Sequence, residues 1–378
     1  MKILFTGGGS GGHFYPIIAI VEQIEKISSE RKILPSKMYF MAPEQFDERM
    51  LFDHNLEFIR VPTGKLRVYF SPKNIIDIFK TFFGVIKAFF KMFAIFPDVV
   101  FGKGGYASFP ALLAARVFRI PIVIHESDSV PGRVNKWAGK FADRIAVSYP
   151  EAAKYFPKAK ERIAWTGQPI RLGIKKHSRE EAENFLQIEK GAPALLVLGG
   201  SQGAEKINDL IIDSLPKLLP NWHIIHQTGR ENFHDVLDRS SVVVSDSELL
   251  KKKYHVFDFL PDQALAMSAG IADLVVSRAG SSIFEIASWG LPSIIIPITE
   301  SNGNHQRVNA FNYEKSGAAI VIEESNLASH LFVEEVENLR MNPELLKKMS
   351  ASANNFFKPD AGRKIAEVLL EIQLEHQI

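Results

Sequence analysis

The chain contains the same junction twice: a short apolar run that leads directly into a cluster of glycines. The run ILFT leads into Gly7–Gly12 near the N-terminus, and the run ALLVL leads into Gly199–Gly203 in the second half. Another cluster, Gly102–Gly105, has the same character. Glycines between a strand and a helix let the backbone turn sharply, and the N–H groups at the helix start favour an anion. The sequence therefore predicts two Rossmann-like α/β domains in tandem, with loops suited to phosphate.

Short apolar runs alternate with longer amphipathic stretches along the chain, as expected for β-α units around parallel sheets. At 378 residues, with about 150 residues per domain as a prior, two domains are expected. The predicted domains are 1–166 and 167–355, followed by a C-terminal helix, 356–378, that could pack back on the first domain. The predicted strands are Lys2–Thr6, Lys37–Met41, Leu56–Val61, Asp98–Phe101, Pro121–His125, Arg144–Ser148, Arg162–Thr166, Ala194–Gly199, Trp222–Gln227, Val242–Ser245, Val256–Leu260, Asp273–Ser277, Ser293–Pro297 and Ala318–Ile322.

The joint between the predicted domains lies near Thr166–Pro169 and is followed by a charged stretch. Within that stretch Ser178 and Glu181 have the spacing of a capping box, which predicts the start of a helix. The region from about Asn342 onward is also expected to be helical.

Composition excludes several classes of protein. The chain has 45 Lys and Arg against 43 Asp and Glu, a net charge of +2, without the basic excess of a nucleic-acid-binding domain. It has no cysteine, which excludes disulfides, thiolate metal sites and a cysteine nucleophile. The start MKILFTGGG does not resemble a secretory signal, and no run approaches the roughly 18 apolar residues of a membrane-spanning helix. We therefore expect a soluble, cytoplasmic protein.

The first glycine loop permits an alternative interpretation. Gly7, Gly9 and Gly12 match the G-x-G-x-x-G fingerprint of dinucleotide-binding enzymes. That fingerprint also requires an acidic residue at the end of the second strand, whereas the run KMYFM is followed by Ala42 and Pro43. The hypothesis that the protein is a nicotinamide-dependent reductase therefore rests on this loop alone. A Walker phosphate loop is excluded, because no Lys-Ser or Lys-Thr pair follows the glycines.

The second half contains a cluster suited to a nucleotide sugar. The segment SRAGSSIFE follows an apolar strand, so Gly280 and the serines after it would present helix N-terminal amides to a diphosphate. Glu285 lies about one turn into that helix, where a carboxylate could accept hydrogen bonds from ribose hydroxyls. One β-α unit later, His305 and Gln306 form a polar pair suited to sugar hydroxyls, at the strand end where ligands bind in α/β sheets.

These segments together resemble a known family. TGGGSGGH, FGKGGYASFP, IHESDSVPGRVNK, TGQPIR, LGGSQGA, SRAGSSIFEIASWGLPSIIIP and HQRVNA occur in the order and spacing of the MurG family, the peptidoglycan UDP-N-acetylglucosamine:lipid I N-acetylglucosaminyltransferases. The resemblance extends from Met1 to about Ala319. It implies a GT-B fold: two Rossmann-like domains with parallel sheets that face each other across a cleft.

The resemblance also implies roles for individual residues. The second domain would hold most of the donor, UDP-GlcNAc, and loops of the first domain would hold the acceptor. The implied donor residues are Ser10, Gly11, Gly12, Arg171, Ser201, Gln202, Phe259, Leu260, Gly280, Ser281, Ser282, Glu285, His305 and Gln306. The implied acceptor residues are Gly104, Gly105, Tyr106, His125 and Asn135.

Glycosyl transfer to a hydroxyl requires a base and stabilisation of the departing diphosphate. His13 is a candidate base because it follows the first glycine loop and can accept a proton near neutrality; Glu126 and Asp128 compete with it. Metal-dependent glycosyltransferases often bind the diphosphate through a metal ion on an Asp-x-Asp motif. The one stretch that loosely resembles this motif, Asp246–Glu248, lies outside every segment of the resemblance. We therefore expect no metal and no further cofactor, with the helix start at Gly280 as the main electrostatic device.

Two positions depart from the family pattern. Related proteins usually have His-Glu-Gln-Asn where this chain has His125–Asp128, and Gly-Asn-Pro where it has Gly167–Pro169. The first change replaces an amide with a carboxylate, Asp128, close to the expected acceptor site. The sequence therefore does not determine which peptide or sugar modifications the acceptor carries.

The segment 65–96 is rich in phenylalanine and lysine and contains one acid, Asp77. Residues 75–93 are too apolar for a helix with one buried face and too charged to span a bilayer. A basic amphipathic surface helix fits this pattern, with aromatics among lipid headgroups and lysines near anionic lipid. The predicted membrane contacts are Phe79, Phe82, Phe83 and Lys87.

The leading prediction is an inverting GlcNAc transfer from UDP-GlcNAc to the MurNAc 4-hydroxyl of undecaprenyl-diphosphate-linked lipid I, which forms lipid II. This places the protein on the cytoplasmic face of the cell membrane, in cell-wall synthesis, cell shape and cell division, with other cell-wall synthesis proteins as candidate partners. Alternatives are a same-fold glycosyltransferase with another lipid or natural-product acceptor, a UDP-GlcNAc epimerase and a non-catalytic nucleotide-sugar sensor.

Overall fold

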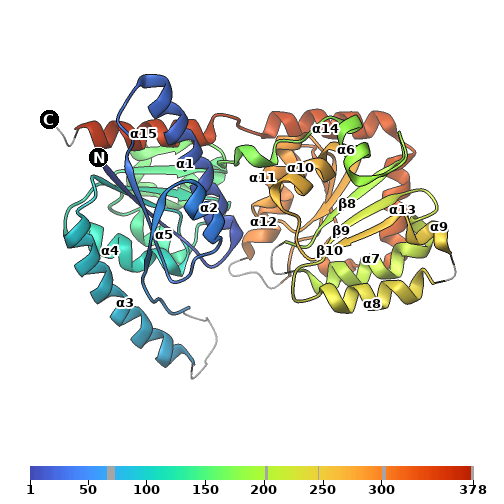
Figure 1. Cartoon of the computed structure of the whole chain (residues 1–378), viewed down its shortest axis with the longest axis horizontal. Helices are drawn as coiled ribbons and strands as arrows, with labels where there is room; N and C mark the ends of the chain where they lie inside the picture. Colours follow the sequence, from blue (N-terminus) through green and yellow to red (C-terminus); the bar gives the residue numbers. More distant parts are fainter. Residues whose placement is uncertain (66–72, 201–202, 246, 300–303, 376–378) are drawn as a thin grey trace. The chain divides into compact units, whose positions relative to one another are not determined.

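The computed structural model of the chain describes residues 1–65, 73–200, 203–245, 247–299 and 304–375 (Figure 1). It divides into two compact units, which we call the first and second domains. The first consists of Met1–Arg171 together with Lys358–Ile378, and the second of Leu172–Phe357. The second domain is thus an insertion between two segments of the first. The divisions lie slightly beyond the boundaries expected after residues 166 and 355.

The first domain is built on a parallel sheet whose strand order reverses in the middle. The order is β3-β2-β1-β4-β5-β6-β7. The strands are β1 (Lys2–Thr6), β2 (Lys37–Ala42), β3 (Leu56–Arg60), β4 (Val99–Gly102), β5 (Ile122–Glu126), β6 (Arg144–Val147) and β7 (Ile163–Trp165). The helices are α1 (Gly11–Arg31), α2 (Glu48–Asp53), α3 (Lys73–Ile95), α4 (Phe109–Val117), α5 (Arg133–Ala138) and α15 (Ala361–Glu375).

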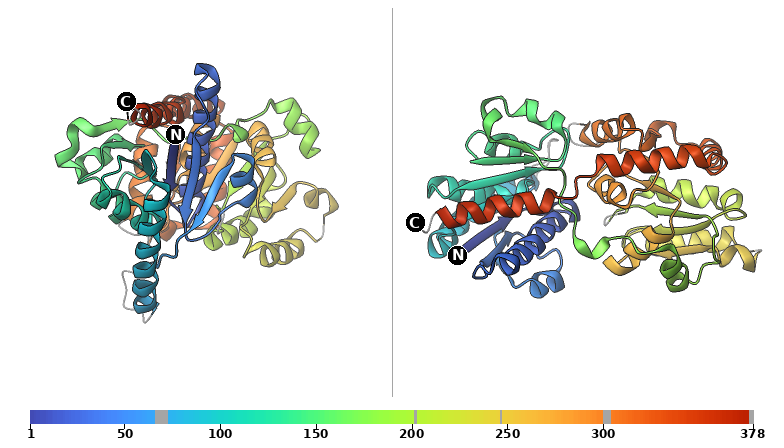
Figure 2. Two further views of the ribbon diagram at one scale, coloured as in Figure 1. Left: turned by 60° about the vertical axis from the view of Figure 1, so that its left-hand side comes forward. Right: turned by 90° about the horizontal axis from the view of Figure 1, so that it is seen from above.

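Alternating side chains of β1 supply both cores of this domain. Ile3 and Phe5 are buried in a cluster with residues of α1 and α15, whereas Leu4 is buried in a second cluster with residues of α3 and α4. Successive side chains of a strand point to opposite faces, so the middle of β1, Ile3–Phe5, is apolar on both faces. Figure 2 shows α15 running alongside α1, and the two helices share Leu369 and Ile17 in one core.

The second domain repeats the same topology. Its strands are β8 (Ala194–Leu198), β9 (His223–Gln227), β10 (Tyr254–Phe257), β11 (Leu274–Ser277), β12 (Ser293–Ile295) and β13 (Ala319–Val321). Their order is β10-β9-β8-β11-β12-β13. The helices are α6 (Arg179–Leu186), α7 (Glu205–Leu218), α8 (Phe233–Val243), α9 (Glu248–Lys251), α10 (Asp262–Ile271), α11 (Ser282–Trp289), α12 (His305–Lys315), α13 (Ser329–Arg340) and α14 (Pro343–Phe356). Helix α6 begins with the predicted capping box of Ser178 and Glu181.

The prediction of a strand at Val242–Ser245 is wrong. These residues form the end of α8 and the turn after it. Val236, Ser240 and Val244 are buried while Val242 is 72% exposed, so burial follows the spacing of a helix. The β-branched run has a local preference for a strand, but packing of the preceding helix overrides it.

Both sheets have a switch point, where the strand order reverses and adjacent connections leave toward opposite faces. It lies between β1 and β4 in the first domain and between β8 and β11 in the second. Ligands of α/β sheets bind outside the carboxyl ends of the strands at such points. The glycine clusters and the turn before α11 follow these four strands. The topology therefore brings the loops predicted from sequence to two sites, one in each domain.

Candidate functional site

At the first switch point, His13 is held between two glycine loops. Ser10 is the residue before α1, and its Oγ lies 3.0 Å from His13 Nδ1. A Cβ placed on Gly105 would lie 3.3 Å from His13 Nε2, so this nitrogen faces the loop after β4. His13 is half-buried, Gly9 is exposed, and Gly12 is partly exposed. The imidazole is therefore oriented at one nitrogen and remains partly accessible.

Glu126 organises the loop after β5. Its Oε1 accepts a hydrogen bond from Asp128 N at 2.9 Å, and its Oε2 accepts from Gly132 N at 3.1 Å and from Asn135 Nδ2 at 2.9 Å. The side chain is 4% exposed, and burial raises the pKa of its carboxyl. Glu126 thus closes a tight loop by its own contacts, and Asp128 is partly exposed on that loop.

The expected acceptor residues lie at two depths. His125 and Asn135 are buried, with His125 Nε2 3.0 Å from the Gly167 carbonyl and Asn135 Nδ2 donating to the His125 carbonyl at 3.0 Å. Burial holds the pKa of His125 well below its usual value, so this imidazole is neutral. Gly105 and Tyr106 are partly exposed, and burial raises the pKa of Tyr106. The buried pair supports the loops, while the outer pair is available to a ligand.

Glycine is required at position 104. Its φ is +88°, a conformation that side chains disfavour. A Cβ there would lie 2.6 Å from Asn135 Nδ2. The close approach explains why the loop after β4 carries glycine beside a buried amide.

Sequence reasoning missed Lys103, which lies in the same loop. Its side chain is 2% exposed, and burial lowers the pKa of its ammonium to about 8, although Glu126 and Asp128 oppose this effect. The ammonium donates a hydrogen bond to Ser127 Oγ. The sequence does contain a signal for this residue, because Lys103 is a charged residue between an apolar strand and two glycines.

Arg171, expected to border the donor site, belongs to the first domain. Its guanidinium lies 3.7 Å from the centroid of the Tyr15 ring, and the residue is 4% exposed. A planar guanidinium over an aromatic ring is a favourable cation–π arrangement. Arg171 therefore stabilises the start of α1, where the first glycine loop ends.

At the second switch point, two glycines have room for a side chain among the described residues. No atom of those residues lies within 4 Å of a Cβ placed on Gly280 or on Gly200. Ser281 precedes α11, and Glu285 lies in the first turn of this helix. Ser282 Oγ lies 2.9 Å from Ser277 Oγ and so supports the turn from within. The predicted donor residues Ser201 and Gln202 lie outside the described residues.

The remaining expected donor residues also have structural contacts. Leu260 N donates to Gln227 Oε1 at 3.0 Å, and the Arg230 guanidinium lies 5.4 Å from the Phe259 ring centroid. Ile298 N donates to Gln306 Oε1 at 3.2 Å. His305 begins α12 and is partly exposed. All these residues follow the carboxyl ends of strands of the second sheet.

An internal ion pair supports the turn before α11. Arg278 Nη2 lies 2.7 Å from Glu324 Oε1, and Arg278 Nη1 donates to the Ile296 carbonyl at 3.2 Å. Glu324 Oε2 accepts from Thr299 Oγ1 at 3.0 Å and lies 3.3 Å from Lys206 Nζ. Burial alone would raise the pKa of Glu324, but hydrogen bonds and charge from Arg278 and Thr299 lower it to about 2.

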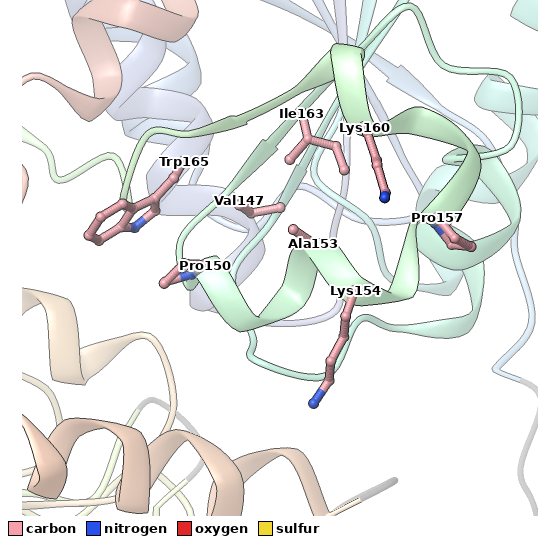
Figure 3. Close-up of a pocket in the computed structure, with 8 residues that line it drawn as sticks. All are labelled: Val147, Pro150, Ala153, Lys154, Pro157, Lys160, Ile163 and Trp165. Atoms are coloured by element: carbon pink, nitrogen blue, oxygen red, sulfur yellow. The ribbon is translucent and has the colours of Figure 1, made fainter.

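A separate pocket of about 430 Å³ lies at the β7 edge of the first sheet (Figure 3). Its lining is largely apolar, and none of the predicted site residues contributes to it. The lining residues are Val147, Pro150, Ala153, Lys154, Pro157, Lys160, Ile163 and Trp165. In the described part of the chain, no group of three or more His, Cys, Asp or Glu side chains is arranged so that it could hold a metal ion.

Comparison with known proteins agrees with this architecture. Residues 3–147 match the glycosyltransferase family 28 N-terminal domain, and residues 194–365 match the C-terminal domain. A curated relative from Halothermothrix orenii, a UDP-N-acetylglucosamine–N-acetylmuramyl-(pentapeptide) pyrophosphoryl-undecaprenol N-acetylglucosamine transferase, is 36% identical over 98% of both chains. The crystal structure of Acinetobacter baumannii MurG has a TM-score of 0.70 at 22% identity and covers 98% of this chain and 99% of that one. A UDP-GlcNAc 2-epimerase from Neisseria meningitidis, bound to UDP-GlcNAc, has a TM-score of 0.68 at 14% identity and covers 98% and 100%.

Two Rossmann-like domains of family 28, each with a glycine-lined switch point, define a glycosyltransferase of the GT-B fold. The likeness to the epimerase reflects this shared fold. Since identity to the curated transferase extends over nearly the whole length of both chains, the chain belongs to the MurG family.

The internal ion pair predicts a pH-dependent stability. Replacing Glu324 by Gln should lower the free energy of unfolding by about 3 kcal/mol at pH 7, because the pKa is lowered from 4.5 to about 2. A carboxyl whose folded-state pKa is lowered stabilises the protein above its unfolded-state pKa, and this stability is lost as pH falls through the folded-state pKa. The difference from wild type should therefore shrink as pH falls from 4.5 to about 2. A series of urea unfolding curves from neutral pH down toward that folded-state pKa measures it.

Glu323→Gln provides the control for Glu324→Gln. Its partner Arg307 is 53% exposed, so loss of this pair should cost less than about 1 kcal/mol. Equal losses in the two variants, or a loss from Glu324→Gln that does not change with pH, would contradict the role of the internal pair.

Proposed function

We propose that the protein transfers GlcNAc from UDP-GlcNAc to the MurNAc 4-hydroxyl of lipid I and so forms lipid II for peptidoglycan synthesis. The observation that carries the proposal is the 36% identity to a curated transferase of this reaction, over both domains and 98% of the chain. The positions of the glycine loops support it, because each domain offers a separate ligand site at its switch point. Two sites are what transfer between two large substrates requires.

The second domain suits the donor. Among the described residues, the room at Gly280 and Gly200 suits a diphosphate near the start of α11, whose N–H groups and dipole favour negative charge. Glu285, in the first turn of α11, would contact the ribose, and the backbone near Phe259 and Leu260 would contact uracil. His305 and Gln306 would then contact the GlcNAc hydroxyls.

The first domain suits the acceptor and the base. With His13 Nδ1 donating to Ser10 Oγ, Nε2 carries the lone pair and can take the proton of the acceptor hydroxyl. The hydroxyl oxygen forms a bond to C1 of GlcNAc while the bond from C1 to the diphosphate breaks, with inversion at C1. Glu126 is less suited as base, because its oxygens accept three hydrogen bonds within its own loop.

The transfer itself is tested with labelled UDP-GlcNAc and a lipid I analogue. The disaccharide product should form, and omission of the analogue should abolish it. If UDP-GlcNAc binds but no disaccharide appears, the acceptor assignment is wrong. A panel of other lipid and natural-product acceptors then tests the second candidate function, a transferase with a different acceptor, which the Ser127 and Asp128 departures favour.

The base is tested by the pH dependence of turnover. His13→Ala should reduce kcat by about 10²-fold or more and remove the acid limb of the profile, since general base catalysis contributes about 10²–10⁴-fold. Asp128→Asn serves as the matched comparison and should change the acceptor KM more than kcat. A His13→Ala variant with near-native turnover eliminates His13 as the base.

Helix α3 suits contact with a membrane surface. Pro62 and Gly64 pass along its inner side, and Gly84 allows the Pro62 carbonyl to approach, because a Cβ there would collide with it. On the outer side Phe79, Phe82 and Phe83 are each about 60% exposed. Further exposed apolar residues on or next to this helix are Ile75, Ile76, Ile78, Ile86, Phe90, Phe93 and Phe96.

Exposed lysines accompany these apolar residues on α3, namely Lys80, Lys87 and Lys91. An apolar surface beside basic residues favours binding to an anionic lipid surface, where the polyprenyl chain of lipid I is embedded. Figures 1 and 2 show the first turns of α3 extending beyond the rest of the first domain. Among the described helices, none is long and apolar enough to span a bilayer. We therefore propose peripheral attachment at the cytoplasmic face of the membrane, near other cell-wall synthesis proteins.

Liposome flotation tests this attachment. Wild-type protein should float with anionic vesicles, and a triple variant, Phe82→Ser, Phe83→Ser and Lys87→Glu, should lose most of that binding. Phe52→Ser is the control, because Phe52 is 81% exposed on α2 of the same domain. Equal flotation of the triple variant and wild type would exclude α3 as the contact surface.

A further inference from the structure

Lys103 is a buried cation that the proposed mechanism does not use. It follows β4, and its backbone N–H donates to the Thr6 carbonyl at 2.8 Å, which ties the loop to β1. A Cβ on Gly7 would lie 2.9 Å from Lys103 Cβ, so glycine at position 7 leaves room for this side chain. Burying an ammonium is costly unless nearby groups compensate its charge. The structure around it should therefore contain that compensation.

Hydrogen bonds connect Lys103 to the ends of three further strands. The ammonium donates to Ser127 Oγ, and Ser127 Oγ donates to Gln168 Oε1 at 2.9 Å. Ser148 Oγ donates to the same Gln168 oxygen at 2.9 Å and lies 3.3 Å from His125 Nε2. Two of these residues, Ser127 and Gln168, are among the three positions that depart from the family pattern, the third being Asp128. Ser127 and Gln168 contact each other, so these two departures form one local arrangement around Lys103.

The charge that compensates Lys103 comes from the loop after β5. Glu126 and Asp128 flank Ser127, and both act on the ammonium electrostatically. Two histidines near Lys103 contribute less to this compensation. His125 is neutral. His13 also lies near Gly7, with its Cβ 3.8 Å from a Cβ placed on that glycine, and is partly exposed. An ionised Glu126 accepts the hydrogen bonds from Asp128 N, Gly132 N and Asn135 Nδ2 more strongly than a neutral carboxyl would. The hydrogen-bonded form of this loop is thus most stable when Glu126 is charged.

We propose that Lys103 is a positioning residue for the acceptor: its hydrogen bond to Ser127 and its positive charge next to Glu126 hold the loop 126–132, with Asp128 on it, in the form that binds the acceptor. This role rests on the proposed function, since it concerns the same acceptor site. Lys103 acts through Glu126 and Ser127 and does not itself touch the substrates. The hydrogen-bonded loop and the buried cation together form one unit at the carboxyl edge of the first sheet.

Lys103→Met tests this role, because methionine has a similar length and no charge. Without the ammonium, the pKa of Glu126 should rise, since a nearby positive charge favours the ionised carboxylate. The rise in acceptor KM at low pH should then begin at a higher pH than in wild type. The donor KM should not change. Lys140→Met, an exposed lysine of the same domain, is the control. An acceptor KM profile identical to wild type would overturn the proposal.

A second measurement needs neither acceptor nor turnover. In protein labelled with ¹³C-lysine, the Lys103 signal should titrate near pH 8, and Glu126→Gln should lower this pKa because a nearby negative charge is lost. An unchanged Lys103 pKa would overturn the coupling, whatever the outcome of the transfer assay. If Lys103→Met does not fold, this titration decides. Failure of lipid I transfer with intact coupling would instead point to a different acceptor.

Discussion

The reversal of strand order within each sheet is the constraint on which the rest of the structure depends. Connections leave β1 and β4 toward opposite faces of the sheet, so the carboxyl ends of these strands lie at a switch point, and the same holds for β8 and β11. Helix starts at such a point can present backbone N–H groups to a ligand. Glycine is needed where a second part of the chain approaches that backbone, as Asn135 does at Gly104.

The two switch points stabilise their loops by different electrostatic means. In the second domain a directly bonded ion pair, Arg278 with Glu324, supports the turn before α11. In the first domain Lys103 bonds to a hydroxyl, and the carboxylate of Glu126 accepts hydrogen bonds from its own loop and from Asn135 of α5. The charges are therefore paired directly in the second domain, whereas Ser127 lies between them in the first.

Sequence reasoning predicted features that depend on local pattern. The apolar strands, the glycine loops and the capping box at Ser178 each involve residues close together in the chain. The error at Val242–Ser245 arose because a β-branched run can end a helix when earlier turns are buried. Arg278 with Glu324 could not be predicted, because their contact depends on the order of β11, β12 and β13. Likewise, the sequence marks Lys103 as a charged residue between an apolar strand and two glycines, but its burial depends on residues distant in the chain, among them Ser127.

The insertion of the second domain has a consequence for synthesis of the chain. Helix α15 covers β1 in one core of the first domain, yet it leaves the ribosome only after the whole second domain. Until then, the apolar side chains of α1 and β1 that α15 covers lack their partner. The second domain is one continuous segment, Leu172–Phe357, and can fold as a unit while the chain is still nascent. The domain that begins first is therefore the last to be completed.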